Sequence, residues 1–176
     1  MSASNLRDAL ILRDFTVSIN SIGKIGMCPS VTIPEFNLEM EDYRGGGMFG
    51  TVEIPMGVEK LDYSFDLFTW DADLWKNIGY GVNSLNVPFV FMGNAFTQIG
   101  TQTTVSVAVT GTLKSIKTDA IVPGKQVKMA CMVAVNNFTH TIDGEVVTDI
   151  DVFANRFLID GTDIMQTSRN NTGFTY

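Results

Sequence analysis

The chain has 176 residues and a formal net charge of −7, with 45% apolar and 18% charged residues. This length suits about one domain, and the shortage of charge against the usual ~25% favours a subunit whose surface is partly covered by other subunits. The 12 lysines and arginines are scattered along the chain, which excludes a nucleic-acid binder that neutralises phosphates with a clustered basic surface.

The amino-terminal segment contains only a short apolar stretch, residues 9–12, bounded by Asp8 and Arg13. It is too short for the core of a signal peptide or for a membrane span, which predicts a protein made and kept in the cytoplasm without a membrane anchor. Cys28 and Cys131 stand far apart among apolar neighbours, which predicts reduced, buried thiols.

The first predicted element is a strand at residues 15–19, where apolar and polar residues alternate. Downstream, Pro34 and Pro55 flank a glycine-rich run and would interrupt strands inside a sheet. The segment between them, about residues 39–57, is therefore predicted to be an extended loop with short strand pieces of its own.

Within this run, Gly45, Gly47 and Gly50 match the spacing G-x-G-x-x-G of dinucleotide-binding loops. That fingerprint requires a helix directly after the glycines, whose start holds the pyrophosphate. Here residues 51–55 are rich in β-branched side chains and end in a proline, so no cofactor site is predicted.

A strand and a helix are predicted next. Alternating apolar residues mark the strand at Leu61, Tyr63, Phe65 and Leu67. Asp71 can cap a short helix that ends at Gly79 or Gly81. The helix residues expected to share one face are Leu74, Trp75 and Ile78.

Two long strands and two hairpins follow. The strands are marked by Val105, Val107 and Val109, and by Val127, Met129, Cys131, Val133 and Val135. The other face of the first strand carries Thr104, Ser106, Thr110 and Thr112, which suits a sheet with one face in water. Asp-Gly pairs at 143–144 and 160–161 indicate tight turns and predict hairpins near residues 138–148 and 156–165.

Together these elements predict a mainly β protein. The expected fold is a single-domain β-sandwich or barrel-like structure of residues 1–176, with one short α-helix and an extended glycine-rich loop.

Residues with reactive side chains form no recognisable catalytic or metal site in the sequence. Residues 157–162 are similar to the signature of haloacid dehalogenase phosphatases, but Leu158 stands where the nucleophilic aspartate is required. The pairs Asp71 with Asp73 and Asp149 with Asp151 could offer oxygens to a cation, but no full ligand loop follows them. The single histidine, His140, has no nucleophilic partner in a recognisable motif. No enzyme activity, metal or cofactor is predicted.

One run carries a family resemblance: Glu41-Asp42-Tyr43-Arg44-Gly45-Gly46-Gly47-Met48, preceded by Val31-Thr32-Ile33-Pro34 and followed by Met56-Gly57. It resembles the major tail tube proteins of contractile-tailed phages and R-type pyocins. Further matches follow in the same order, including the helix near 74–78, Gly111-Thr112-Leu113-Lys114, Asp143-Gly144, Asp160-Gly161 and Arg169-Asn170-Asn171. The similarity spans nearly the whole chain, and departs from the family in the first dozen residues and in the length of residues 90–103.

This resemblance implies a structural subunit of a virion tail, assembled in the host cytoplasm. It implies homo-hexameric rings with a continuous inner β-barrel, stacked head to tail inside a sheath protein. A tape measure protein and DNA, or another payload, would pass inside without tight binding. The acidic balance and the Thr- and Ser-rich strand faces agree with a wall that does not retain DNA, because like charge removes the gain from counterion release.

The predicted assembly contact is the glycine-rich run, with the residues Glu41, Tyr43, Arg44, Gly46, Gly47, Met48 and Phe49. Glycines allow an extended loop that orders on docking, Met48 and Phe49 offer adaptable apolar anchors, and Arg44 offers a planar ion-pairing group. An ordinary surface loop is the simpler alternative. The alternative function is a soluble carbohydrate-binding β-sandwich with Trp70 and Trp75 as a stacking platform, although such residues are more often buried against a sheet.

Overall fold

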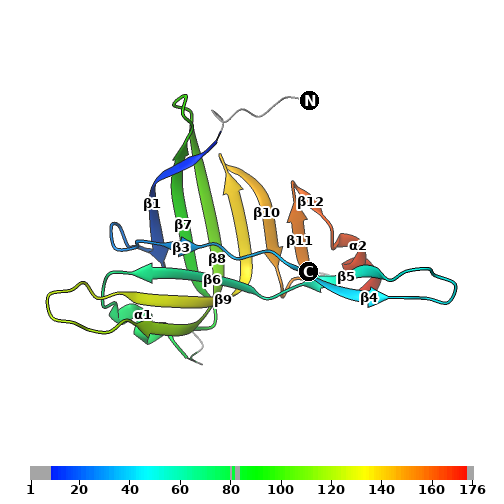
Figure 1. The fold of residues 1–176 in the computed structure, drawn as a ribbon, viewed down its shortest axis with the longest axis horizontal. Coiled ribbons are helices and arrows are strands. Elements are labelled where there is room, and N and C mark those ends of the chain that lie inside the picture. The colour runs from blue at the N-terminus through cyan, green and yellow to red at the C-terminus, as the bar shows by residue number, and fades with distance from the viewer. Residues whose placement is uncertain (1–8, 80, 82–83, 174–176) are drawn as a thin grey trace.

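The computed structural model describes residues 9–79, 81 and 84–173 (Figure 1). Strands dominate it, together with two short helices. In chain order the elements are β1 (Ile11–Ile19), β2 (Ile22–Gly23), β3 (Val31–Thr32), β4 (Leu38–Tyr43), β5 (Val52–Val58), β6 (Leu61–Leu67), α1 (Ala72–Asn77), β7 (Val87–Phe96), β8 (Gln102–Thr118), β9 (Met129–Ile142), β10 (Glu145–Asp151), β11 (Arg156–Ile159), β12 (Thr162–Asp163) and α2 (Gln166–Thr172).

Most strands join one bent sheet in the order β12-β11-β10-β9-β8-β7-β1-β2, while β6 pairs with β9 and β3 with β6. Residues 129–135 of β9 pair with β6, and residues 137–142 of the same strand pair with β10. Strand β8 runs beside β9 through both parts. The long strands β8 and β9 therefore belong to two layers, an upright one and a lower one in Figure 1.

The sheet bends where β8 passes very close to β9. The register of the two strands shifts between Thr110 and Gly111. A Cβ atom added to Gly111 would lie 2.1 Å from the backbone oxygen of Ala134, so a glycine is required at this crossing.

The hydrophobic core lies between the two layers. From β6, the rings of Tyr63 and Phe65 lie 6.2 and 5.6 Å from the ring of Phe89 on β7, a strand with which β6 does not pair. A fully buried phenylalanine such as Phe89 stabilises the fold by about 1.5–3 kcal/mol. The predicted mainly β, sandwich-like fold is confirmed.

The predicted strands at 15–19, 61–67 and 105–109 lie in β1, β6 and β8, and β9 begins at Met129, two residues after Val127. Both predicted turns are also confirmed. Asp143 and Gly144 have φ values of 50° and 84°, and Asp160 and Gly161 have 48° and 72°. These left-handed conformations close the β9–β10 and β11–β12 hairpins.

Helix α1 agrees with its prediction only in part. Asp71 is the N-cap and its carboxylate accepts the N–H of Asp73 at 2.9 Å, and Leu74 is buried. Trp75 does not share that buried face, since 43% of it is exposed. Trp70 is 58% exposed, so the expected burial of the tryptophans is wrong.

Strand β7 and helix α2 were not predicted, nor was the two-residue strand β2. Strand β7 lies between β1 and β8 in the sheet. It begins just before residues 90–103, the segment whose length departs from the resembled family, and ends inside it. Helix α2 near the carboxyl end buries none of its residues. It is held by Arg169, which pairs with Asp163 and donates to the backbone oxygen of Asn155 at 2.8 Å, and it ends at Gly173 with φ 71°.

Candidate assembly surfaces

The glycine-rich run forms a β-hairpin that projects from one end of the molecule (Figure 1). Strands β4 and β5 pair only with each other, and residues 44–51 connect them. The strand pieces expected within this segment are the two regular strands β4 and β5, and the loop itself is confined to residues 44–51. Pro55 is tolerated because each strand of a two-stranded sheet keeps one free edge, where a missing N–H does no harm.

The base of this hairpin is anchored to the body of the protein. The ring of Phe36 lies 5.3 Å from that of Phe157 on β11, and Val58 packs against the core. The backbone N–H of Glu59 donates to the oxygen of Asn37 at 2.9 Å. The hairpin is thus fixed at its base while its strands and tip stand in solvent.

The tip brings together three of the residues singled out in the sequence. The N–H of Gly45 contacts the sulfur of Met48 at 3.1 Å, and the Met48 N–H donates to the Gly45 oxygen at 3.2 Å. The Tyr43 hydroxyl lies against the same glycine, 3.1 Å from the place a Cβ would take. Met48 is therefore partly folded back onto the tip, and it is less exposed than expected for an anchor.

Phe49 and Arg44 are instead presented outward. Phe49 is fully exposed. Arg44 makes no ion pair with any residue in the described ranges. Glu41 lies farther down β4, opposite Ile54, while Gly46 and the positive-φ Gly47 shape the connection.

The hairpin exposes an unusual number of large apolar side chains for a surface element. Between 42% and 105% of each is exposed, and they are Leu38, Met40, Tyr43, Phe49, Val52, Ile54 and Met56. Sequence reasoning singled out Met48 and Phe49 but missed the strand residues, whose signal is the alternation of apolar and acidic residues on β4 and β5.

The edges of the large sheet form a second kind of surface. Among the described residues, β2 covers β1 only at Ser18 and Ile19, and β11 covers only residues 148–151 of β10. Both edges carry exposed aliphatic side chains, namely Leu10, Ile11 and Leu12 on one and Val146, Val147 and Ile159 on the other. Unpaired strand edges with apolar side chains are ready to pair with another chain.

The face of the upright layer that points away from the core is polar. Cross-strand registers place Asn94 beside Thr104, Ser106 beside Thr141, and Thr110 beside Asn137. Asp149 and Asp151 continue this face on β10. As predicted, Thr104, Ser106 and Thr110 lie on the face of β8 that points away from the buried Val107 and Val109.

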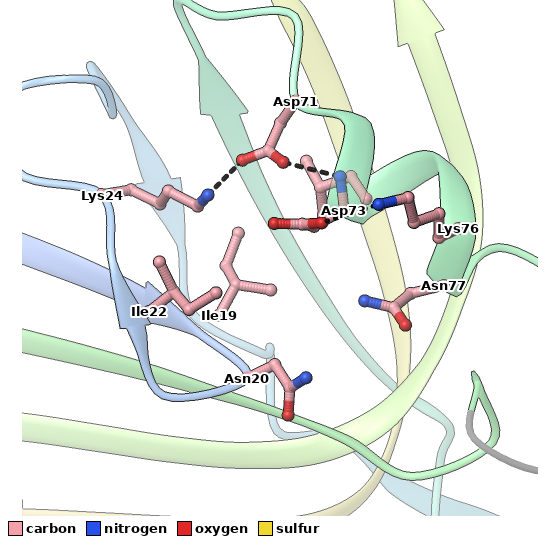
Figure 2. Close-up of a pocket in the computed structure, with 9 residues that line it drawn as sticks. Ile19, Asn20, Ile22, Lys24, Asp71, Asp73, Lys76 and Asn77 are labelled. Atoms are coloured by element: carbon pink, nitrogen blue, oxygen red, sulfur yellow. Dashed lines mark hydrogen bonds and ion pairs between the residues drawn. The ribbon is translucent and has the colours of Figure 1, made fainter.

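A cleft of about 190 Å³ beside α1 contains the buried ion pair between Lys24 and Asp71 (Figure 2). The second Asp71 oxygen accepts the N–H of Asp73, so both oxygens have structural partners. Lys76 is turned to Asp73 at 3.4 Å. The ion pair between Lys24 and Asp71 ties the β1–β2 hairpin to α1.

The other candidate chemical groups also have structural roles. Asp149 accepts from Thr139 at 2.8 Å and pairs with Arg156 at 2.6 Å, while Asp151 accepts from Asn137 at 2.8 Å. In the part of the chain that the structure describes, no cluster of ligating side chains could hold a metal ion. Cys28 is half-buried rather than buried, and Cys131 is buried. Both thiols are free, and burial raises the pKa of Cys131 to about 12, so it is no thiolate nucleophile near neutral pH.

Within the described ranges, neither helix is long or apolar enough to cross a membrane.

Comparison with known proteins gives a family match over most of the chain. A family model described as phage tail tube protein FII matches residues 9–173. The tail tube protein of Escherichia phage P2 is 27% identical over 168 residues, which cover 92% of this chain and 96% of that protein. The major tail tube protein of Serratia phage KSP20 is 44% identical over 48 residues, 27% of this chain and 28% of that protein.

Solved structures share the fold at low sequence identity. A chain from the sheath-tube complex of an extracellular contractile injection system, in its extended state, has a TM-score of 0.55 at 12% identity, covering 72% of this chain and 87% of that chain. A chain from the tube-terminating cap of the anti-feeding prophage has a TM-score of 0.53 at 15% identity, covering 73% and 86%. The fold of this chain thus occurs in both of these assemblies.

Proposed function

Because this chain belongs to the phage tail tube protein FII family, we propose that it forms hexameric rings that stack into a tube inside a contractile sheath. It is a structural subunit of the tail tube and part of the virion tail. The projecting hairpin carries the stacking proposal, because it exposes seven large apolar side chains that solvent would not favour.

Lateral closure of the ring uses the open sheet edges. The β1 edge of one subunit meets the β10–β11 edge of the next, which satisfies free N–H and C=O groups and covers aliphatic side chains on both. Such a contact joins different surfaces of identical subunits, and it ends growth only when the ring closes.

The polar face of the upright layer lines the channel. Its Thr, Ser and Asn side chains offer DNA no array of cations, so a tape measure protein and DNA, or another payload, pass without being retained. The sheath surrounds the outside of the tube, and assembly takes place in the host cytoplasm. The role is that of a conduit and involves no catalysis, with residues 1–176 acting as one tube-forming unit.

The hairpin tip, with Glu41, Tyr43, Arg44, Gly46, Gly47, Met48 and Phe49, makes the ring-to-ring contact. The test is electron microscopy of purified Arg44→Glu and of a deletion of residues 46–49. We expect both variants to fold with unchanged circular dichroism and to yield subunits or single rings in place of tubes. Lys76→Glu, the same charge reversal on helix α1 and away from both the hairpin and the sheet edges, is the matched control and forms tubes. Normal tubes from both hairpin variants would reject the stacking role.

A further inference from the structure

The hairpin carries concentrated negative charge as well as apolar side chains. Four acidic residues, Glu39, Glu41, Asp42 and Glu53, are exposed on its strands, against the single cation Arg44. Asp42 and Glu53 are directly opposite each other in the β4–β5 register. Like charges directly opposite each other destabilise an isolated hairpin. A cation from another molecule would therefore stabilise this pair by offsetting the repulsion.

The opposite end of the long molecular axis carries the complementary charge (Figure 1). Here the connection between β8 and β9, residues 119–128, extends away from the body of the protein. Lys117 and Lys125 are exposed at this end, and neither forms an ion pair with any described residue. Ile121 and Val122, which are 60% and 43% exposed, lie between them in sequence.

Two further lysines near this end already have partners. Lys114 pairs with Asp62 at 2.5 Å and Lys128 with Asp66 at 2.9 Å. Asp119 stands in the same connection and offsets part of its positive charge. Lys117 and Lys125 therefore supply the cationic character that is open to another molecule.

We propose that the acidic β4–β5 hairpin of one subunit docks on the β8–β9 connection of a second copy, with Asp42 and Glu53 facing Lys117 and Lys125. Met40, which lies on the same face of β4 as Asp42, and Phe49 at the tip pack against Ile121 and Val122. This rests on the proposed self-association of the hairpin and names the surface that receives it. The contact joins two different surfaces of identical subunits, so it is not completed within one pair and repeats from copy to copy.

Salt is a first test of this docking. Both charged surfaces are exposed, and the screening length falls from about 10 Å at 0.1 M salt to about 3 Å at 1 M. Light scattering should show that tubes grow from purified subunits about tenfold more slowly at the higher concentration, as expected for association guided by complementary charge. Growth at an equal or higher rate in 1 M salt would contradict the proposal.

A charge exchange is the decisive test. Asp42→Lys with Glu53→Lys reverses the charge of the hairpin pair. Like charges still face each other across the strands, so the repulsion within the hairpin is the same as in the wild type. Lys117→Glu with Lys125→Glu reverses the receiving surface. Each double variant should lose tube formation by electron microscopy, and the fourfold variant that combines them should recover it. Lys60→Glu with Lys76→Glu, an equal charge change at exposed residues outside both surfaces, should assemble normally.

The outcomes separate this inference from the stacking role itself. Loss of tubes in the hairpin variant, with normal tubes in the Lys117 and Lys125 variant, would overturn the receiving surface and leave the hairpin contact in place. Loss in both variants without recovery in the fourfold variant would also overturn the pairing. Normal tubes from both double variants would overturn the charged docking, while the deletion of residues 46–49 still decides the role of the hairpin.

Discussion

Asp71 makes both a local contact, as the cap of helix α1, and an ion pair with a residue that is distant in sequence. It caps α1 through the N–H of Asp73, and it pairs with Lys24, which follows β2 (Figure 2). Burial alone would raise the pKa of Asp71, but the hydrogen bonds from Lys24 and the Asp73 N–H outweigh it and lower the pKa below its usual value. The charged form is therefore the one that stabilises the folded subunit.

We expect Asp71→Asn to lower the free energy of unfolding by about 2–3 kcal/mol at neutral pH, because it keeps the cap but leaves Lys24 buried without its partner. The contribution of a carboxylate with a lowered pKa is present above about pH 4, its unfolded value, and is lost as pH falls through the lower folded pKa. The gap between wild type and variant should therefore shrink between pH 5 and pH 2.

Urea denaturation of unassembled subunits, followed by tryptophan fluorescence, measures this gap at each pH. Asp73→Asn is the matched control, since Asp73 is exposed and meets only Lys76. It should change the free energy of unfolding by less than about 0.5 kcal/mol. A constant gap for Asp71→Asn from pH 7 to pH 2 would contradict the assigned role.

The sequence predicts one of the two contacts of Asp71. The cap at Asp71 was predicted because a helix start has a local signature that can be read from a few residues. The partner Lys24 was not predicted, since the residues between them carry no signal of the approach. The exposure of Trp75 was missed for a similar reason, because helical spacing alone does not tell how wide the covered face is.

At the level of elements, the bend of β8 depends on Gly111. We expect Gly111→Ala to destabilise the subunit by at least about 2 kcal/mol, because its Cβ meets a backbone atom that cannot turn away. Gly57→Ala is the control, a strand glycine with no atom within 4 Å of an added Cβ. Thermal unfolding of the two variants measures the difference, and equal melting temperatures would show that the crossing tolerates a side chain.

The structure confirms the strands that were predicted from alternating apolar and polar residues. In the elements that were missed, this alternation is obscured or absent. Strand β7 buries Val87, Phe89 and Phe91 in strict alternation, but Pro88 and the apolar Met92 on its other face obscure the period. Pro88 stands before Phe89, where the ladder between β7 and β1 begins, so it interrupts no pairing with β1. Helix α2 has no apolar face at all, and only Gly173 after it gave a stop signal.

At the scale of the whole molecule, the polar sheet face predicts how an assembled tube treats DNA. Ser106→Lys with Thr110→Lys would line the proposed channel with cations, and we expect DNA release from assembled tubes to slow about tenfold or more in low salt. Raising the salt concentration should restore fast release. Ser115→Lys, farther along β8, is the control, and unchanged release from the double variant would place this face away from the channel.

The tube itself was predicted from the ordered family motifs, and the family match confirms that identity. The sequence alone does not predict the surface that we propose to receive the hairpin. Lys117 and Lys125 are scattered charges in sequence, and they gain meaning only because the fold sets them at the end opposite the hairpin.

The unbroken passage of β8 and β9 through both layers also has a mechanical meaning. Hydrogen bonds between antiparallel strands lie across the strand direction, so a pull along two long strands loads many of these bonds at once in shear. Strand β8 faces β9 over most of its length. A tube wall built on this pair would resist axial force by sharing it along the whole ladder, where a wall of short hairpins would peel open one bond at a time.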